Sequence, residues 1–144
     1  TPLLRVLEKY AVRVGGGTNH RFSLSDGILI KENGIRAAGG IAPAVALARS
    51  AAHHLLRVEV EAETIQDVEA AVAAGADAVL LDNMPPSMVR EAVARFGGIV
   101  FLEASGGIHL GNIEEYARTG VAAVAVGAIT HSAPAFDISF ELSP

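Results

Sequence analysis

Charged or hydroxyl side chains close several short apolar runs of this sequence. Lys31, Glu61, Asp82 and Ser105 each stand at the end of such a run, and Gly127 closes the last one. Carboxylates such as Glu61 and Asp82 suit a hard cation like Mg²⁺, which takes one or two carboxylates together with phosphate oxygens of a substrate. The alternative is a pair of surface acids without a ligand. The joint pattern favours an active site.

Two of these runs lead into glycine-rich loops. Ser105-Gly106-Gly107 follows the run that carries Glu103, and Val126-Gly127-Ala128 follows the last run. Glycine lets backbone N–H groups approach an anion closely, so these loops predict a phosphate site. Glycine loops also serve simply as turns, and by themselves they indicate the site only weakly.

Basic side chains that could hold an anion lie near both ends of the chain. His20, Arg21 and Lys31 come early, and His131 comes late. Arginine presents a fork of N–H donors that matches the geometry of carboxylates and phosphates. A single histidine is more often structural than catalytic, so His131 carries less weight. Together, the acids, the glycines and the basic residues predict a site for an anionic, phosphorylated substrate and a divalent cation.

The elements that must position these residues follow from hydrophobic periodicity. Predicted strands cover residues 27–31, 56–61, 78–82, 99–104, 122–126 and 136–142, and predicted helices cover 2–14, 41–54, 65–74, 86–95 and 111–119. Alternation of strand and helix predicts parallel strands joined by crossover helices, as an open sheet or a barrel. Neither a G-x-G-x-x-G nor a Walker A motif is present, which favours a parallel α/β barrel with fewer than eight strands. In such a barrel the reactive groups gather at the carboxyl ends of the strands.

Composition narrows the class of protein. The 144 residues predict one domain, residues 1–144, and the net charge of −5 disfavours a nucleic-acid partner. The absence of cysteine excludes a disulfide framework and fits a cytoplasmic protein. No signal peptide opens the sequence, and no apolar run reaches the ~18 residues that cross a bilayer, so we expect no membrane partner. The mean hydropathy of +0.39 then indicates a deep core or a face covered by another chain.

Seven segments, in order and with compatible spacing, resemble the quinolinate phosphoribosyltransferase family. They are residues 7–17 (LEKYAVRVGGG), 19–21 (NHR), 30–33 (IKEN), 58–61 (VEVE), 80–84 (LLDNM), 102–108 (LEASGGI) and 126–132 (VGAITHS). The resemblance runs nearly end to end and is specific as a set. It implies an α/β-barrel enzyme that converts quinolinate and phosphoribosyl pyrophosphate to nicotinate mononucleotide, pyrophosphate and carbon dioxide with Mg²⁺, in NAD biosynthesis.

The resemblance also implies roles for the residues that match these motifs. His20 and Arg21 would bind the quinolinate carboxylates, with Lys31 beside the reacting region. Glu61 and Asp82 would serve the ribose hydroxyls and the metal-bound pyrophosphate. Further substrate contacts would come from Asn83 and Glu103, and the 5′-phosphate would be held by Ser105, Gly106, Gly107, Gly127, Ala128 and His131.

The sequence departs from the family pattern in two respects. Gly34 stands where the family usually has a histidine after Lys-x-Asn. The family enzyme also begins with a separate α/β domain and a strand that ends in Thr-Arg-Lys-Thr, and this chain starts after that motif. We therefore expect an N-terminally incomplete barrel without its first strand. It would work only in a homo-oligomer, at least a dimer, of a longer or cleaved polypeptide whose N-terminal domain completes the site.

Two other functions agree with part of the pattern. Lys31 could form a Schiff base in a barrel lyase or aldolase, because burial can activate a lysine amine. That function explains the phosphate loops but leaves Glu61, Asp82 and His20 without a role. The chain could also be a non-catalytic, incomplete barrel module that only assembles or binds phosphorylated ligands.

Overall fold

The computed structural model describes residues 1–143. It divides into two compact units. The terminal unit contains Thr1–Asn19 and the residues from Gly127 on, and the sheet unit contains His20–Val126. Among the described residues, no helix has the length and apolar character needed to cross a membrane.

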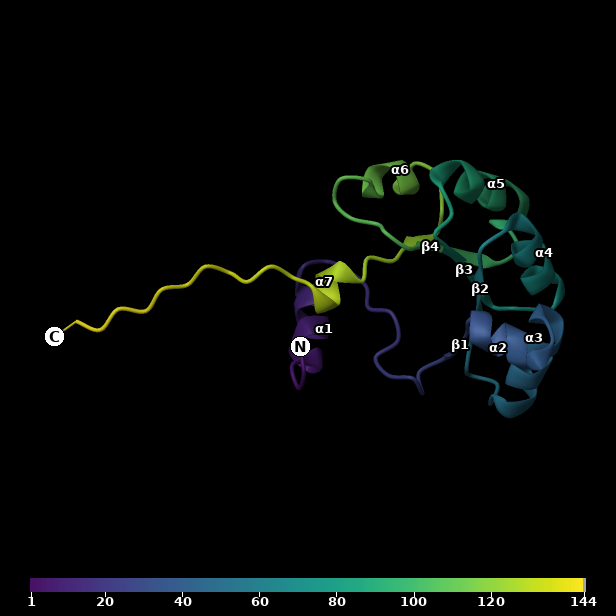
Figure 1. Cartoon of the computed structure of the whole chain (residues 1–144), viewed down its shortest axis with the longest axis horizontal. Coiled ribbons are helices and arrows are strands. Elements are labelled where there is room, and N and C mark those ends of the chain that lie inside the picture. The colour runs from purple at the N-terminus through teal and green to yellow at the C-terminus, as the bar shows by residue number, and fades with distance from the viewer. Residues whose placement is uncertain (144) are drawn as a thin grey trace. The chain divides into compact units, whose positions relative to one another are not determined.

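The sheet unit is built on five parallel strands that neighbour one another in chain order (Figure 1). They are β1 (Ile28–Ile30), β2 (Val58–Ala62), β3 (Ala78–Asp82), β4 (Phe101–Ser105) and β5 (Ala123–Val124). A doubly wound sheet reverses its strand order at a switch point, whereas the strands of a parallel barrel follow the chain. The predicted α/β class, with a barrel-type sheet of fewer than eight strands, is therefore confirmed.

Five helices of the sheet unit lie on the same side of the sheet (Figure 1). They are α2 (Glu32–Ala38), α3 (Ile41–Ala51), α4 (Ile65–Ala73), α5 (Pro86–Phe96) and α6 (Ile113–Ala117). Strands joined in sequence by crossovers of one hand place every connecting helix on one face. That face holds the core, in which Val60, Val79 and Leu81 have no exposed surface.

The other face of the sheet carries acids. In β2, Val58, Val60 and Ala62 are buried, while Glu59 and Glu61 alternate with them and remain partly accessible. The parallel register places Glu61 beside Leu80 and Leu80 beside Glu103, and Asp82 lies two residues beyond Leu80 on the same side. We call this surface the carboxylate face, defined by Glu59, Glu61, Asp82 and Glu103.

The predicted elements agree with the structure in most places and fail in three. The strand at 78–82 has the predicted bounds, and the others differ by a few residues. The sequence did not predict α2, because Asn33 and Gly34 are poor helix formers inside its first turns. It also missed α7 (Ala128–His131), a single helical turn. This turn belongs to the terminal unit, together with α1 (Arg5–Val14).

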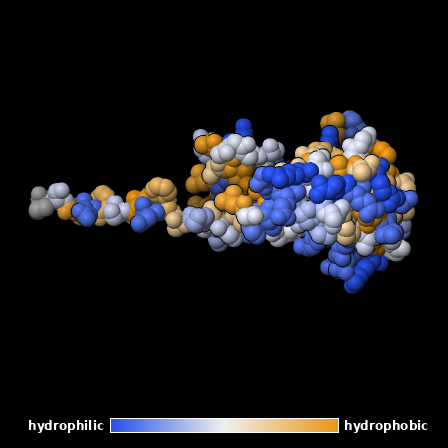
Figure 2. Space-filling model, turned by 90° about the horizontal axis from the view of Figure 1, so that it is seen from above, coloured by the Kyte–Doolittle hydropathy of each residue, from blue (hydrophilic) through white to orange (hydrophobic). Residues whose placement is uncertain are grey.

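The third failure is the strand predicted at residues 136–142. These residues form no strand in the structure, and Figure 2 shows them as a thin segment in which apolar and polar residues alternate. Phe136, Ile138, Phe140 and Leu142 are each 79–87% exposed. Alternation indicates which side chains share a face, but a strand also needs a neighbour to pair with its N–H and C=O groups. No such neighbour exists among residues 1–143.

Candidate functional site

Lys31 and Glu61 form an ion pair at the carboxyl ends of β1 and β2. Ile30 pairs with Val60 in the parallel register, so the next residues of the two strands are also neighbours. Lys31 Nζ lies 2.8 Å from Glu61 Oε2, and the side chains are 62% and 12% exposed, respectively. The structure thus brings two of the predicted site residues into direct contact.

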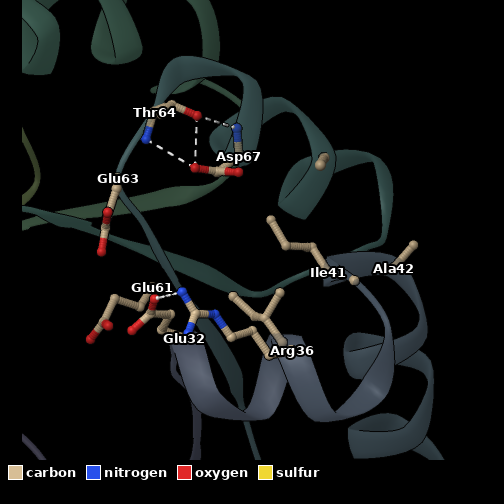
Figure 3. A pocket seen from close by; sticks show the side chains of 11 residues that line it. Glu32, Arg36, Ile41, Ala42, Glu61, Glu63, Thr64 and Asp67 are labelled. Atoms are coloured by element: carbon tan, nitrogen blue, oxygen red, sulfur yellow. Dashed lines mark hydrogen bonds and ion pairs between the residues drawn. The ribbon is translucent and has the colours of Figure 1, made fainter.

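A pocket of about 430 Å³ opens beside Glu61, between α2 and the start of α4 (Figure 3). Acids line part of its wall, with Glu32, Glu63 and Asp67 near Glu61. Two of these acids already have partners. Glu32 pairs with Arg36 at 2.6 Å, and Asp67 exchanges hydrogen bonds with Thr64 in a capping box at the start of α4. Such a box satisfies otherwise unpaired N–H groups of the first helical turn.

Asp82, Asn83 and Gly106 form a second group at the carboxyl ends of β3 and β4. Asn83 Nδ2 donates to Asp82 Oδ2 at 2.7 Å, and the Asn83 N–H donates to the Ser105 carbonyl at 2.9 Å. Asn83 has a φ of 53°, in the left-handed region. Gly106 lies so close that a Cβ there would be 2.2 Å from Asn83 Oδ1. The glycine therefore makes room for the amide that orients the Asp82 carboxylate.

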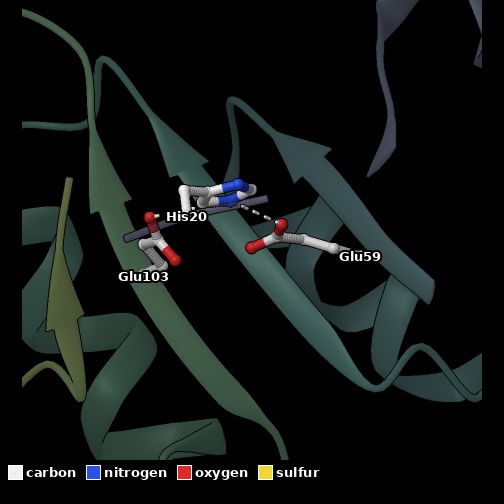
Figure 4. A group of neighbouring side chains, drawn as sticks. All are labelled: His20, Glu59 and Glu103. Carbon is white, nitrogen blue, oxygen red and sulfur yellow. Dashed lines mark hydrogen bonds and ion pairs between the residues drawn. The ribbon is translucent and has the colours of Figure 1, made fainter. Parts of the chain in front are cut away.

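His20 lies between the carboxylates of Glu59 on β2 and Glu103 on β4, on the carboxylate face (Figure 4). Its Nε2 is 3.1 Å from Glu59 Oε2 and 3.9 Å from Glu103 Oε1. Burial and the charge of Glu59 raise the pKa of Glu103 above its usual range. Glu103, one of the predicted site residues, thus feels the charge of both His20 and Glu59. The sequence analysis had not singled out Glu59.

The hydrogen bonds of His20 indicate which of its nitrogens carries the proton. The backbone N–H of Arg21 donates to Nδ1 at 2.8 Å, so Nδ1 is an acceptor and the hydrogen of the neutral ring is on Nε2. The Nε2–H then donates to Glu59. Ligand atoms of His20, Glu59 and Glu103 lie within 4.8 Å of one another and could in principle hold a metal ion. A metal on Nε2 would require a proton on Nδ1, where the Arg21 N–H already points, so the geometry disfavours that use.

Arg21 lies away from the strand ends where we expected it. Its Nη1 donates to the carbonyl of Gly27 at 3.0 Å, just before β1 begins. Arg21 is therefore at the amino end of the sheet, while Lys31 and Asp82 are at the carboxyl end. The predicted residues Arg21, His20 and Lys31 therefore lie at different points along the strands, from the amino end of the sheet to its carboxyl end. The predicted contact of Arg21 with quinolinate stays a prediction.

The two predicted phosphate loops fall in different units. Gly106 and Gly107 follow β4 in the sheet unit, with consecutive positive φ values of 94° and 61°. Gly127, Ala128 and His131 belong to the terminal unit, where His131 Nδ1 lies 2.7 Å from Ser132 Oγ. Whether both loops hold one anion remains a prediction.

The sequence contained a signal for Glu59 that we did not use. In Val58-Glu59-Val60-Glu61 the two glutamates are two residues apart in a strand, so their side chains point to the same face of the sheet. The contact of His20 with Glu59 had no such signal, because these residues are 39 positions apart.

Glu61 and Asp82, the predicted metal ligands, offer oxygen atoms of the kind that Mg²⁺ prefers. They project from neighbouring strands on the same face. Lys31 already neutralises part of the Glu61 charge, and Asn83 orients Asp82. The donor chemistry of these residues fits a hard cation shared with a phosphorylated ligand.

Comparison with known proteins gives one consistent result. The model of the quinolinate phosphoribosyl transferase C-terminal domain matches residues 1–141. A probable nicotinate-nucleotide pyrophosphorylase (carboxylating) of Bacillus subtilis is 48% identical over 143 residues, covering 99% of this chain and 50% of that protein. The human nicotinate-nucleotide pyrophosphorylase (carboxylating) is 40% identical over 146 residues, covering 99% of this chain and 49% of that protein.

A solved structure gives the same similarity in three dimensions. The nicotinate-nucleotide pyrophosphorylase from Francisella tularensis superposes with a TM-score of 0.87 at 48% identity, covering 90% of this chain and 46% of that one. The chain therefore spans about half the length of the curated relatives that it matches.

Substitution of Gly106 should disturb the site more than substitution of its neighbour. Gly106→Ala places a methyl group against Asn83 and keeps the φ of 94°, so we expect the free energy of unfolding to fall by about 3 kcal/mol or more. Gly107→Ala has open space around its Cβ, and its left-handed backbone alone should lower that free energy by about 1–2 kcal/mol. Urea unfolding measures both values, and NMR of the Asn83 side-chain amide reports the displacement. Equal losses for the two variants would contradict the close approach at Gly106.

The acid at position 103 should make stability depend on pH. Because the pKa of Glu103 is raised, the folded protein holds this proton more tightly than the unfolded chain does. The resulting stability is complete below the ordinary value of 4.5 and is lost as pH rises through the folded value. We therefore expect Glu103→Gln to gain stability over the wild type between about pH 4 and pH 7. The control is Glu115→Gln, an exposed carboxylate, and the idea fails if urea unfolding gives both variants the same pH dependence.

Proposed function

The chain belongs to the family of the quinolinate phosphoribosyl transferase C-terminal domain, and from that premise we propose that it supplies the catalytic face of an enzyme that transfers phosphoribosyl to quinolinate. Phosphoribosyl pyrophosphate would be the donor, and nicotinate mononucleotide, pyrophosphate and carbon dioxide would be the products. The observation that carries this proposal is the carboxylate face, on which Lys31–Glu61, Asp82–Asn83 and His20–Glu103 lie side by side on consecutive strands. We keep a cytoplasmic location as part of the proposal.

Glu61 and Asp82 are suited to the donor sugar. When pyrophosphate leaves C1′, positive charge develops on the ribose ring, and carboxylates near that ring stabilise it. Glu61 is mostly buried and held by Lys31, and Asp82 is held by Asn83, so neither must reorganise during the reaction. The two residues would also hold Mg²⁺, which, when bound, supplies positive charge to the departing pyrophosphate.

The remaining predicted residues would position the two substrates. His20 and Arg21 would orient the carboxylates of the pyridine ring so that its nitrogen faces C1′, an arrangement that supplies proximity. In the sheet unit, Ser105, Gly106 and Gly107 would hold the 5′-phosphate, and the terminal unit offers Gly127, Ala128 and His131 as the second predicted phosphate loop. Gly106 and Gly107 support this assignment, because glycine lets backbone N–H groups approach an anion closely.

The rival Schiff-base function receives no support from Lys31. A Schiff-base lysine reacts as a free amine, which requires a desolvated setting. Lys31 is 62% exposed and lies 2.8 Å from a carboxylate. We therefore prefer phosphoribosyl transfer, and the absence of borohydride trapping with a carbonyl substrate is the corresponding expectation.

The proposal includes a homo-oligomer, at least a dimer, of a longer polypeptide. Three apolar side chains of α1, Leu7, Tyr10 and Val14, are 62–69% exposed, as expected of a surface that another chain covers. In the described part of the chain β1 pairs only with β2, which leaves an edge for a further strand. The carboxylate face also needs more positive charge than His20, Arg21 and Lys31 provide before it can bind a dicarboxylate and a pyrophosphate.

Removal of one site carboxylate should slow turnover without unfolding the protein. Glu61→Gln and Asp82→Asn should each lower kcat by roughly 10²–10³, the range for loss of one electrostatic stabiliser. The matched control, Glu115→Gln, changes an exposed acid of α6 and should leave kcat within about threefold. Release of carbon dioxide from carboxyl-labelled quinolinate, with phosphoribosyl pyrophosphate and Mg²⁺, measures the rate in the polypeptide that includes the preceding domain. Wild-type rates in both site variants would exclude the proposed roles.

The 144-residue chain alone should be nearly inactive. Without additional cationic groups we expect less than about one hundredth of the turnover of the longer polypeptide. Adding the N-terminal piece in trans should restore part of that rate, together with a sedimentation velocity of at least a dimer. Full activity of the isolated chain as a monomer would show the assembly proposal to be mistaken, and nucleotide production in any form would exclude a purely non-catalytic module.

A further inference from the structure

Glu59 is an unexpected residue in a site for anions. Its carboxylate lies 3.1 Å from the ring of His20, and Glu103 is close by, so two acids surround one imidazole. If His20 and Arg21 bind a dicarboxylate, as in the proposed function on which this inference rests, then charge alone makes Glu59 unfavourable. Its presence therefore calls for another role.

The segment that carries His20 has no secondary structure of its own. Residues 17–22 form neither helix nor strand, so side-chain hydrogen bonds must hold the segment. Three of them do so in series. Glu59 accepts the Nε2–H of His20, Nδ1 of the same ring accepts the backbone N–H of Arg21, and the Arg21 guanidinium donates to the Gly27 carbonyl at 3.0 Å.

This series ties the loop to two strands. Glu59 belongs to β2, whose alternate residues are fully buried, and Gly27 directly precedes β1. A carboxylate on a rigid strand that accepts one ring N–H determines both the tautomer and the orientation of the imidazole. The other nitrogen is then an acceptor and can hold the next residue's N–H.

We propose that Glu59 is a positioning residue, whose carboxylate holds the His20 ring and through it the backbone of Arg21, and so fixes the loop that borders the site for an aromatic dicarboxylic acid. This role depends on a hydrogen-bond acceptor at the right distance from the His20 ring, and the negative charge of Glu59 is not required for it. This separates the proposal from a purely electrostatic role for Glu59.

Two nearly isosteric substitutions separate reach from charge. Glu59→Gln keeps an oxygen acceptor at the same distance and removes the charge, whereas Glu59→Asp keeps the charge and withdraws the acceptor by one methylene. Glu115→Gln and Glu115→Asp, at an exposed acid of α6, are the matched controls. Both pairs change the volume little, so we expect all four proteins to fold, and thermal unfolding verifies it.

The first readout is local and independent of any substrate. NMR hydrogen exchange of the Arg21 amide, and the ring N–H signal of His20 assigned with His20→Gln, report the series of bonds. We expect exchange of the Arg21 amide to accelerate at least roughly tenfold in Glu59→Asp, and to stay within about threefold of wild type in Glu59→Gln and in both controls. Unchanged protection in Glu59→Asp, or equal loss in Glu59→Gln, would overturn the proposal.

The second readout is the binding of quinolinate, measured calorimetrically on the polypeptide that includes the preceding domain. Positioning predicts roughly tenfold weaker binding for Glu59→Asp and equal or tighter binding for Glu59→Gln. A charge-only role predicts tighter binding for Glu59→Gln and no change for Glu59→Asp, which would refute positioning. If wild type binds no quinolinate while the exchange pattern is as expected, the proposed function fails and the role of Glu59 in holding the loop stands. If quinolinate binds and the exchange pattern is absent, the proposed function stands and the role of Glu59 in holding the loop fails.

Discussion

Side chains of a β-strand alternate between the two faces of a sheet, and in the sheet unit the helices cover only one of these faces. This constraint divides every strand into two kinds of position. Residues such as Val60 and Leu81 face the helices and are fully buried, so they must be apolar and of the right size. Their neighbours in the chain, such as Glu59 and Asp82, face the other way and are free to carry charge. The candidate site exists because the stable core occupies the opposite side of the same strands.

Neighbouring side chains partly compensate the negative charges of the carboxylate face. Glu61 has Lys31, Asp82 has the amide of Asn83, and Glu59 has the ring N–H of His20. Glu103 is the least compensated of the four, since burial and Glu59 both oppose its ionisation and raise its pKa. A partly buried row of acids with so few cations is more stable when a ligand, a metal ion or a basic segment supplies positive charge.

The sequence predicted what depends on local periodicity and failed where distant parts of the chain meet. Apolar runs bounded by glycine gave β3 and the class of the sheet, because burial on one face requires that pattern. The polar residues after each run predicted that Lys31 and Glu61 would lie at the same end of the sheet. Nothing local indicated that His20 would reach Glu59, or that the Arg21 guanidinium would bind the Gly27 carbonyl before β1. The false strand at residues 136–142 had the right alternation, but periodicity does not supply a pairing partner.

That same stretch, Phe136 to Leu142, has a practical consequence for handling the protein. It places four large apolar side chains at every second position, each at least 79% exposed, with Asp137 and Glu141 as its only acids. Segments of this kind stack readily with identical copies into intermolecular sheets. Concentrated solutions of the chain should therefore be prone to aggregate through this stretch, with the acids acting as gatekeepers against it. Whatever covers these side chains in the cell would then act as a solubility factor as well as a structural partner.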